Sequence, residues 1–382
     1  MELRAETGFY GWLKESKYSI RNICLFSLLI VLLSRLLLFL LFCGYAGVQG
    51  DTRTFLQALN IWDAEWYQGI TTQGYTWGAD YGGGLVNWAF FPLFSLIVRG
   101  ANFLTGLDIN ILGFVLNILF QAGALALLMR YVLETRGANM RQAVVLCVLF
   151  SLGCYTFYFA SYYTESLYLF LFAGGLLFLH RRQYLFAGIF GFFLALTKNT
   201  GIVLLLGMLI QLLYDHRKGQ HKGKLRDAIL GAVLTAAGLV LFMLFLWTRT
   251  GDPLAFVHVQ SAWEGSIGNP FVTIANGFAS GKARQIFFAV CALAGLALCC
   301  FLVYKKRYAE AGMAFALLLI PVSVRLQSIP RYIACNALFM LAFTDLLFHI
   351  NKKWLAITAV IASAALECGL VFLWFGSSTL LW

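Results

Sequence analysis

Charged residues are scarce in this 382-residue chain, in which Asp, Glu, Lys and Arg make up 12% of the sequence and hydrophobic residues 61%. Soluble domains carry about twice that share of charge, so the composition excludes an ordinary soluble fold. Several signatures are missing as well: the nine cysteines show no CxxC spacing, and neither a P-loop nor a Gly-x-Ser-x-Gly nucleophile elbow occurs. These absences argue against a disulfide framework, a zinc site, a P-loop nucleotide enzyme and a serine hydrolase.

The chain is instead rich in long apolar runs. Its mean hydropathy is +0.79, and Leu- and Phe-rich runs of about 20 residues, the length that a helix needs to cross the hydrocarbon layer, recur throughout. Because these runs show no strand-like alternation, we predict an all-α polytopic membrane protein with a single domain over residues 1–382. About eleven crossings (range 10–13) are expected, near 22–46, 109–133, 142–160, 164–180, 183–198, 200–214, 228–249, 285–304, 308–326, 331–349 and 354–376.

One further apolar segment, residues 88–105, is too short and too polar to be counted as a crossing. It contains Pro92, Arg99 and Asn102, and we predict a re-entrant or interfacial helix there. With this topology most of the 28 Lys and Arg residues fall in loops on the side of the N-terminus, as the positive-inside rule requires. The N-terminus is therefore expected inside, and the net charge of +11 reflects membrane topology and gives no indication of nucleic-acid binding.

The first loop on the outer, non-cytoplasmic face, about residues 47–88, begins with an unusual cluster. Its segment Trp-Asp-Ala-Glu-Trp-Tyr holds two carboxylates, Asp63 and Glu65, between the aromatic residues Trp62 and Tyr67. A carboxylate held among aromatic rings at a membrane face is suited to act as a general base on a sugar hydroxyl, or to bind a cation. The alternative is an interfacial aromatic belt with solvated acids.

Other outer-face residues are suited to a polar, anionic substrate. Tyr163 and Glu165 lie between two predicted helices, where Glu165 would either bind sugar hydroxyls or act as an acid in the first helical turn. Lys198 and Arg331 stand beside predicted helix starts and would bind phosphate, with Arg325 reinforcing them. For Lys198, interfacial anchoring is the alternative.

Two residues carry weaker signals. His258 lies on the second long outer loop, where a single histidine is either structural or catalytic. Arg35 lies within the first predicted crossing and would pair with a neighbouring helix.

The order of these motifs resembles a known family. Trp-Asp-Ala-x-Trp-Tyr, Gly-Tyr, Ala-Phe-Phe-Pro-Leu, Tyr-Thr-Glu-Ser-Leu, Leu-Thr-Lys-Asn-Thr-Gly and Pro-Arg-Tyr follow one another between about residues 22 and 350, as in the PIG-V-like mannosyltransferases of the GT-C class. The resemblance implies a GT-C-like fold and transfer of mannose, or a related hexose, from a polyprenyl-phosphate carrier at the non-cytoplasmic face. It makes Asp63 the catalytic carboxylate, with Glu65 beside it.

Two features depart from that family. Lys198-Asn199 stands where Arg with a small residue is expected, and the chain is short for a eukaryotic member. The second departure favours a bacterial protein of the cytoplasmic membrane with its active site on the periplasmic or extracellular side.

We therefore expect an inverting glycosyltransferase. Its partners would be a polyprenyl-phosphate sugar donor and a lipid- or glycan-linked acceptor. Because a lipid phosphate is a good leaving group, no cofactor is required; a divalent metal would be compatible with the reaction but is not implied. The alternative is a polytopic lipid or sugar transporter or flippase, which would carry ionisable groups near the bilayer midplane.

Overall fold

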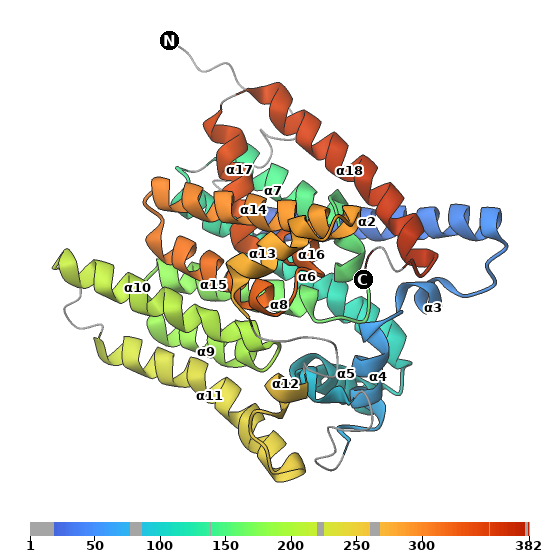
Figure 1. Cartoon of the computed structure of the whole chain (residues 1–382), viewed down its shortest axis with the longest axis horizontal. Helices are drawn as coiled ribbons and strands as arrows, with labels where there is room; N and C mark the ends of the chain where they lie inside the picture. The colour runs from blue at the N-terminus through green and yellow to red at the C-terminus, as the bar shows by residue number, and fades with distance from the viewer. Residues whose placement is uncertain are drawn as a thin grey trace.

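The structure is a computed structural model that describes residues 19–76, 86–137, 139–219, 225–259, 268–350, 352–378 and 381. Within these ranges all regular structure is helical and no strand occurs, which confirms the prediction of an all-α protein (Figure 1). The elements are α2 (Ile20–Gln49), α3 (Phe55–Leu59), α4 (Asp63–Thr72), η1 (Asn87–Ala89), α5 (Leu93–Thr105), α6 (Ile109–Thr135), α7 (Met140–Leu152), η2 (Thr156–Phe159), α8 (Glu165–His180), α9 (Tyr184–Ala195), η3 (Asn199–Ile202), α10 (Val203–Arg217), α11 (Leu225–Thr250), α12 (Ala255–His258), α13 (Pro270–Ala279), α14 (Ala283–Tyr304), α15 (Tyr308–Val324), α16 (Ile329–Ala334), α17 (Ala337–His349) and α18 (Lys353–Phe375).

Five of these helices are long and apolar enough to cross a membrane: α2, α6, α11, α14 and α18. The protein is accordingly an all-α protein with membrane-spanning helices. The six other predicted crossings correspond to α7, α8, α9, α10, α15 and α17, which have 12 to 17 residues. A straight crossing takes about 20 residues, so the count of eleven crossings stays a prediction.

Helix α8 forms the centre of the bundle. Nearly all of its residues are buried, from Glu165 at its start to Leu179 near its end. In a membrane protein a helix that is apolar on all sides can face lipid or other helices. Helix α8 is enclosed by protein, because it packs against α6, α9 and α10. Beside it α9 and α11 cross at small residues: a Cβ added to Gly188 would lie 2.3 Å from the Cα of Gly231. Such close backbone approach is typical of membrane helices.

Two predicted crossings are interrupted in the structure. The segment expected to be helical over 142–160 ends at Leu152, because Gly153 is extended, and resumes as the short turn η2. The segment expected over 331–349 is divided into α16 and α17, because the side chain of Asn336 accepts a hydrogen bond from the backbone N–H of Leu338 and starts a new helix. Apolar composition predicted both runs, but the capping residues decide where the helices begin and end.

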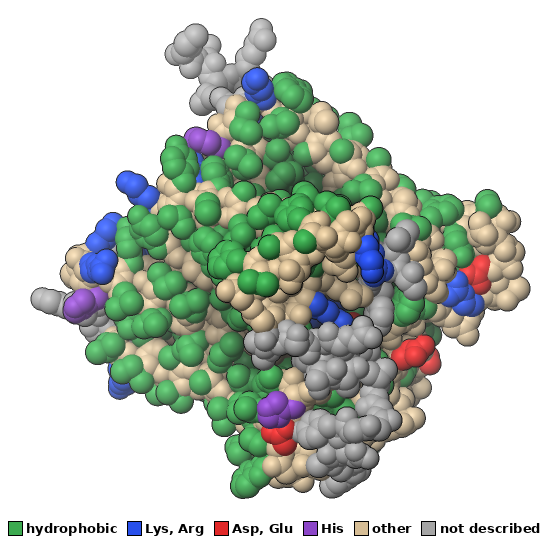
Figure 2. All heavy atoms as spheres, viewed as in Figure 1, with side chains coloured by type: hydrophobic (Ala, Val, Ile, Leu, Met, Phe, Trp, Pro, Cys, Tyr) green, Lys and Arg blue, Asp and Glu red, His purple; other side chains and the backbone are tan. Residues whose placement is uncertain are grey.

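The segment 88–105 forms η1 and the 13-residue helix α5. Phe94 and Val98 are buried against the bundle, whereas Phe103 and Leu104 are more than four-fifths exposed. This helix is therefore buried on one face only, and its position at the membrane interface stays a prediction. Figure 2 shows hydrophobic side chains spread over most of the visible face, with Lys and Arg mainly towards its edges, as expected for a surface in contact with lipid.

Candidate functional site

A cavity of about 420 Å³ opens where α4, α8, α15 and α16 meet. Figure 1 shows α4, α5 and α12 gathered at the same end of the bundle. The lining brings together residues from seven separate elements or their flanks: Asp63, Tyr67, Ala89, Phe90, Phe91, Glu165, Tyr168, Lys198, Asn199, Thr200, Phe256, Val257, Leu317, Ile320, Pro321, Ser323, Val324, Arg325, Gln327, Ser328, Arg331, Tyr332, Cys335 and Asn336.

Asp63 is the first residue of α4, and its backbone is held firmly. Trp62 before it has a φ of 60°, a left-handed conformation that costs a bulky residue about 1–3 kcal/mol and persists only where surrounding contacts enforce it. Here the N–H of Asp63 donates to the hydroxyl of Tyr163 at 3.0 Å, and that hydroxyl donates to the carbonyl of Ile61 at 3.1 Å. The turn thereby presents the Asp63 carboxylate to the cavity.

Four ionisable side chains form one group at the cavity, which we call the Arg331 cluster: Asp63, Glu165, Lys198 and Arg331. Nζ of Lys198 donates to Oε1 of Glu165 at 2.9 Å. Arg331 lies between the two acids, with Nη1 3.8 Å from Oδ2 of Asp63 and Nε 4.0 Å from Oε1 of Glu165. Glu165 is buried and the Arg331 side chain is 11% exposed, whereas 27% of the Asp63 side chain and 26% of the Lys198 side chain remain exposed. Asp63 is therefore the accessible acid of the cluster.

Aromatic rings orient the two cations. The guanidinium of Arg331 lies over the ring of Tyr158 at 4.7 Å and near that of Tyr332 at 5.1 Å. Lys198 lies 5.8 Å from the ring of Tyr168 and 5.9 Å from that of Tyr332. Cation–π contacts of this kind fix a cation without neutralising it. The charge of Lys198 is balanced by Glu165 instead.

Three buried polar atoms of this site make no hydrogen bond: Oε2 of Glu165, Nε of Arg331 and the hydroxyl of Tyr168. Buried polar atoms in folded proteins nearly always have a hydrogen-bond partner. Glu165 and Tyr168 are three residues apart on α8, so they share one face of the helix. All three residues line the cavity, so the site carries unused hydrogen-bonding capacity there.

The surroundings of Asp63 affect its basicity. Burial raises the pKa of Asp63 above its ordinary value of 3.8, and the positive charge of Arg331 only partly offsets this effect. A carboxylate with a raised pKa is a stronger base than an exposed one. The residue nevertheless stays close to a cation, which favours its ionised form.

Part of the cavity wall is apolar. It is formed by Leu317, Ile320, Pro321 and Val324 of α15. Ile320 is 42% exposed and lines the cavity. Pro321 leaves one helical hydrogen bond unmade, which weakens α15 at that wall.

The other predicted site residues occupy several different positions. Tyr67 and Arg325 line the cavity, and Trp62 packs against the hydrophobic core. Glu65 is exposed and does not line the cavity. Nδ1 of His258 lies 2.7 Å from Oδ2 of Asp252, so the histidine has an acidic partner on its own loop, although Val257 beside it reaches the cavity.

Sequence analysis missed several residues of the site. Tyr158, Tyr168 and Tyr332 contact the cations, and Asn336 lines the cavity. Tyr332 directly follows Arg331, and Tyr158 belongs to an aromatic segment beside Tyr163. Both tyrosines could therefore have been predicted from their closeness in sequence to residues of the site. No sequence signal identifies Tyr168, because it lies in the middle of an apolar run.

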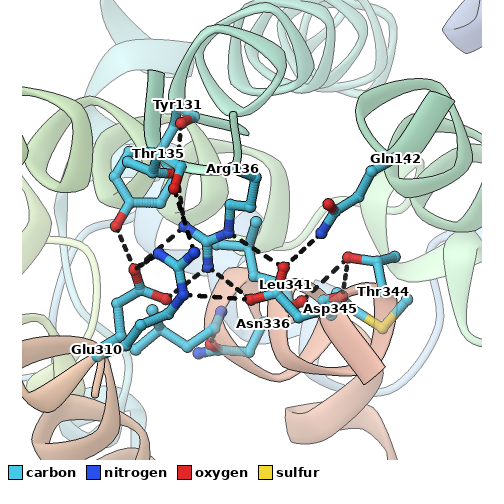
Figure 3. Close-up of polar contacts among 12 residues, drawn as sticks. Tyr131, Thr135, Arg136, Gln142, Glu310, Asn336, Leu341, Thr344 and Asp345 are labelled. Carbon is cyan, nitrogen blue, oxygen red and sulfur yellow. Dashed lines mark hydrogen bonds and ion pairs between the residues drawn. The ribbon is translucent and has the colours of Figure 1, made fainter. Parts of the chain in front are cut away.

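A second group of charged residues lies at the other end of α15. In this Arg136 cluster, the guanidinium of Arg136 bonds to Glu310 at 2.7 and 3.2 Å and to Asp345 at 3.1 and 3.2 Å (Figure 3). Tyr131 donates to Glu310 at 2.7 Å, and Gln142 donates to Asp345. Glu310 and Asp345 therefore receive several hydrogen bonds each, in contrast to the acids of the Arg331 cluster.

The described residues contain no group of three or more His, Cys, Asp or Glu side chains that is arranged to hold a metal ion. All nine cysteines are free, in agreement with the absence of a disulfide framework. In comparisons with known proteins, no family model matches the chain and no curated protein matches it. The resemblance to the PIG-V-like mannosyltransferases therefore stays a prediction.

Proposed function

We propose that the protein is an inverting glycosyltransferase that moves mannose, or a related hexose, from a polyprenyl-phosphate carrier to a lipid- or glycan-linked acceptor at the non-cytoplasmic membrane face. The observation that carries this proposal is that Asp63 and Arg331 lie 3.8 Å apart beside a cavity whose lining also includes apolar residues of α15. A base, an anion-binding cation and an apolar wall are the three features that a lipid-phosphate donor and a hydroxyl acceptor need together.

In the proposed reaction, Asp63 accepts the proton of an acceptor hydroxyl while that oxygen attacks the anomeric carbon of the donor sugar. The bond between the anomeric carbon and the phosphate oxygen breaks, and its electron pair leaves with the lipid phosphate. Arg331 stabilises the developing charge on the phosphate. Because the donor phosphate competes with Asp63 for Arg331, donor binding would release the carboxylate for its role as a base.

The remaining groups of the cavity have roles that follow from their positions. Lys198 holds Glu165 and adds a second positive charge near the phosphate. Oε2 of Glu165 and the hydroxyl of Tyr168, which make no hydrogen bond, would bind hydroxyl groups of the sugar. Leu317, Ile320 and Val324 would contact the first isoprene units of the carrier. Arg325 lines the cavity and would add to the positive potential there.

The test is transfer of radiolabelled mannose from polyprenyl-phosphate mannose to a membrane extract by the purified protein. We expect a labelled product with the wild type, and a loss of about 10²–10⁴-fold with Asp63→Asn, the contribution typical of a general base. Glu65→Gln is the matched control, because Glu65 is exposed and does not line the cavity. Equal activity of Asp63→Asn and wild type would refute the mechanism.

A negative result with the wild type has a defined next step. Other polyprenyl-phosphate sugars are then supplied, because the apolar wall and Arg331 recognise the carrier and not the sugar. If no lipid-linked sugar is transferred and the protein in vesicles moves such a lipid between leaflets, the transporter alternative replaces the transferase.

A further inference from the structure

The short turn η2 (Thr156–Phe159) depends on contacts from elsewhere in the chain. It has four residues and follows Tyr155, whose φ is 65° in the left-handed region. An isolated 3₁₀ turn of this length makes too few hydrogen bonds to be stable alone. Two charged side chains from membrane-spanning helices, Glu367 and Arg35, bind its two ends.

Glu367 of α18 binds the first end of the turn. Its Oε1 accepts a hydrogen bond from the hydroxyl of Thr156 at 2.6 Å and another from the N–H of Phe157 at 3.1 Å. The side chain is 5% exposed. A carboxylate is a strong acceptor for the unpaired N–H groups at the start of a helical turn, so Glu367 fixes the position where η2 begins.

Arg35 of α2 binds the other end. Its Nη2 donates to the carbonyl of Phe159 at 3.0 Å and also to Oε1 of Gln121, and Nη1 donates to Ser34 at 2.9 Å. Gln121 in turn donates to the carbonyl of Phe150 at 2.8 Å. Arg35 is 5% exposed, and the prediction that it pairs with a neighbouring helix is confirmed by its bond to Gln121 of α6.

The turn between these two charges carries the aromatic support of the Arg331 cluster. The ring of Tyr158 lies beneath the Arg331 guanidinium at 4.7 Å and meets the edge of Tyr163 at 5.3 Å. Tyr163 in turn accepts the hydrogen bond from the N–H of Asp63. A displacement of η2 would therefore move both the cation and the proposed base.

We infer that Arg35 and Glu367 are positioning residues, which hold η2 from its two ends and thereby set the distance between Asp63 and Arg331. Neither residue belongs to the cavity lining. A charged side chain inside a membrane helix is costly unless it has a specific partner and a function. Here the partners are the two ends of one turn, and the function is the geometry of the site. The part of this inference that concerns catalysis rests on the proposed function.

The first measurement is hydrogen–deuterium exchange of the full-length protein in detergent, which needs no substrate. In Glu367→Ala we expect exchange to rise roughly tenfold in peptides covering 155–164, the effect of losing a buried hydrogen bond, together with a smaller rise over 61–68. Glu367→Gln should stay close to the wild type, because its amide oxygen still accepts both hydrogen bonds. Asp345→Ala, which removes a buried carboxylate from the Arg136 cluster, is the control and should leave both segments unchanged.

The second measurement is steady-state transfer with the same variants. We expect kcat of Glu367→Ala to fall by about 10²-fold, the cost of misplacing reacting groups by about 1 Å, with a smaller change in KM and with recovery in Glu367→Gln. Unchanged exchange over 155–164, an equal rise across all helices, or raised exchange with unaltered kcat would each overturn the inference. If even the wild type transfers no sugar, the proposed function fails, and the exchange data alone decide whether Glu367 holds the turn.

Discussion

Arg136 and Arg331 are both buried arginines that face two carboxylates, near opposite ends of α15, yet their hydrogen bonding differs. Arg136 makes four hydrogen bonds of 2.7–3.2 Å to Glu310 and Asp345. Arg331 approaches Asp63 and Glu165 only at 3.8 and 4.0 Å. Glu310 of the Arg136 cluster lies near the start of α15, and Arg325, which lines the cavity beside the Arg331 cluster, directly follows its end. The 15 positions between these two residues correspond to about 22 Å along a helix. The two clusters are therefore separate sites.

The contrast indicates different roles. All three guanidinium nitrogens of Arg136 donate hydrogen bonds, so Arg136 has little left to offer a ligand and serves to fix helices relative to one another, although Nε of the neighbouring Arg307 makes no hydrogen bond. A cluster with long contacts, unbonded polar atoms and an adjoining cavity of about 420 Å³ is suited to a ligand. A smaller cavity of about 250 Å³ touches Glu310 and Arg307, but neither Arg136 nor Asp345 is part of its lining.

The largest effect is expected at Arg331. Arg331→Ala should lower kcat/KM for the lipid donor by about 10²–10³-fold, because it removes the charge that stabilises the leaving phosphate. Arg331→Lys should recover part of this loss, since it restores the charge without the planar group that stacks on Tyr158. Steady-state kinetics over a range of donor concentrations would measure kcat/KM for both variants. An unchanged kcat/KM in Arg331→Ala would remove the distinction between the two clusters.

At Arg136 the effect should fall on stability. Arg136→Ala leaves two buried carboxylates without their main partner and is expected to cost about 3–5 kcal/mol. Thermal unfolding of the purified protein, followed by the loss of monodisperse material, would measure it. Arg226→Ala is the matched control, because the Arg226 side chain is 87% exposed and surface substitutions change stability by about 0.5 kcal/mol or less. Equal unfolding temperatures of the two variants would contradict a structural role for Arg136.

The dependence of activity and stability on pH tests the role assigned to Asp63. Since burial raises the pKa of Asp63 above 3.8, kcat/KM should rise with pH through a limb above that value, where the carboxylate becomes ionised. A raised pKa also means that the ionised form of Asp63 disfavours folding, whereas its protonated form stabilises the folded state. This stabilisation is present below the pKa of the unfolded state and is lost as pH rises through the pKa of the folded state. Asp63→Asn should therefore be no less stable than the wild type at neutral pH.

The variant Arg331→Ala provides a control for assigning the acidic limb of the pH profile to Asp63. Arg331 lowers the pKa of Asp63, so the residual activity of Arg331→Ala should show its acidic limb at higher pH than the wild type. A limb at the same pH in both proteins would assign the titration to a different group.

The smallest effect is expected at Lys198. Lys198→Met removes the partner of Glu165 at 2.9 Å but leaves Arg331 beside both acids, so KM for the donor should rise by about tenfold, the value of one hydrogen bond to a charged group. Lys198→Arg, which keeps the charge, should stay closer to the wild type. A larger loss in Lys198→Met than in Arg331→Ala would reverse the proposed roles of the two cations.

The sequence predicted the apolar helices, because hydropathy is a local property. It also singled out Asp63, Lys198 and Arg331, which line one cavity in the structure, but the roles assigned to them stay predictions. It did not predict the partners of the charged side chains. The bonding of Lys198 to Glu165 and of Arg35 to Phe159 depends on how distant helices pack. The same holds for the Arg136 cluster. Long-range pairing, unlike helix formation, leaves no period in the sequence.

The different roles of the Arg331 and Arg136 clusters can be tested with two matched variants, Asp63→Asn and Asp345→Asn. For each variant we would measure the transfer activity per folded molecule and the unfolding temperature. Both substitutions remove one carboxylate charge from a buried arginine cluster. We predict that Asp63→Asn folds normally and loses transfer, whereas Asp345→Asn unfolds at a lower temperature and keeps the activity of its folded fraction. Full activity in folded Asp63→Asn would contradict the catalytic role of the Arg331 cluster. A loss of activity in folded Asp345→Asn as large as that in Asp63→Asn would contradict the purely structural role of the Arg136 cluster.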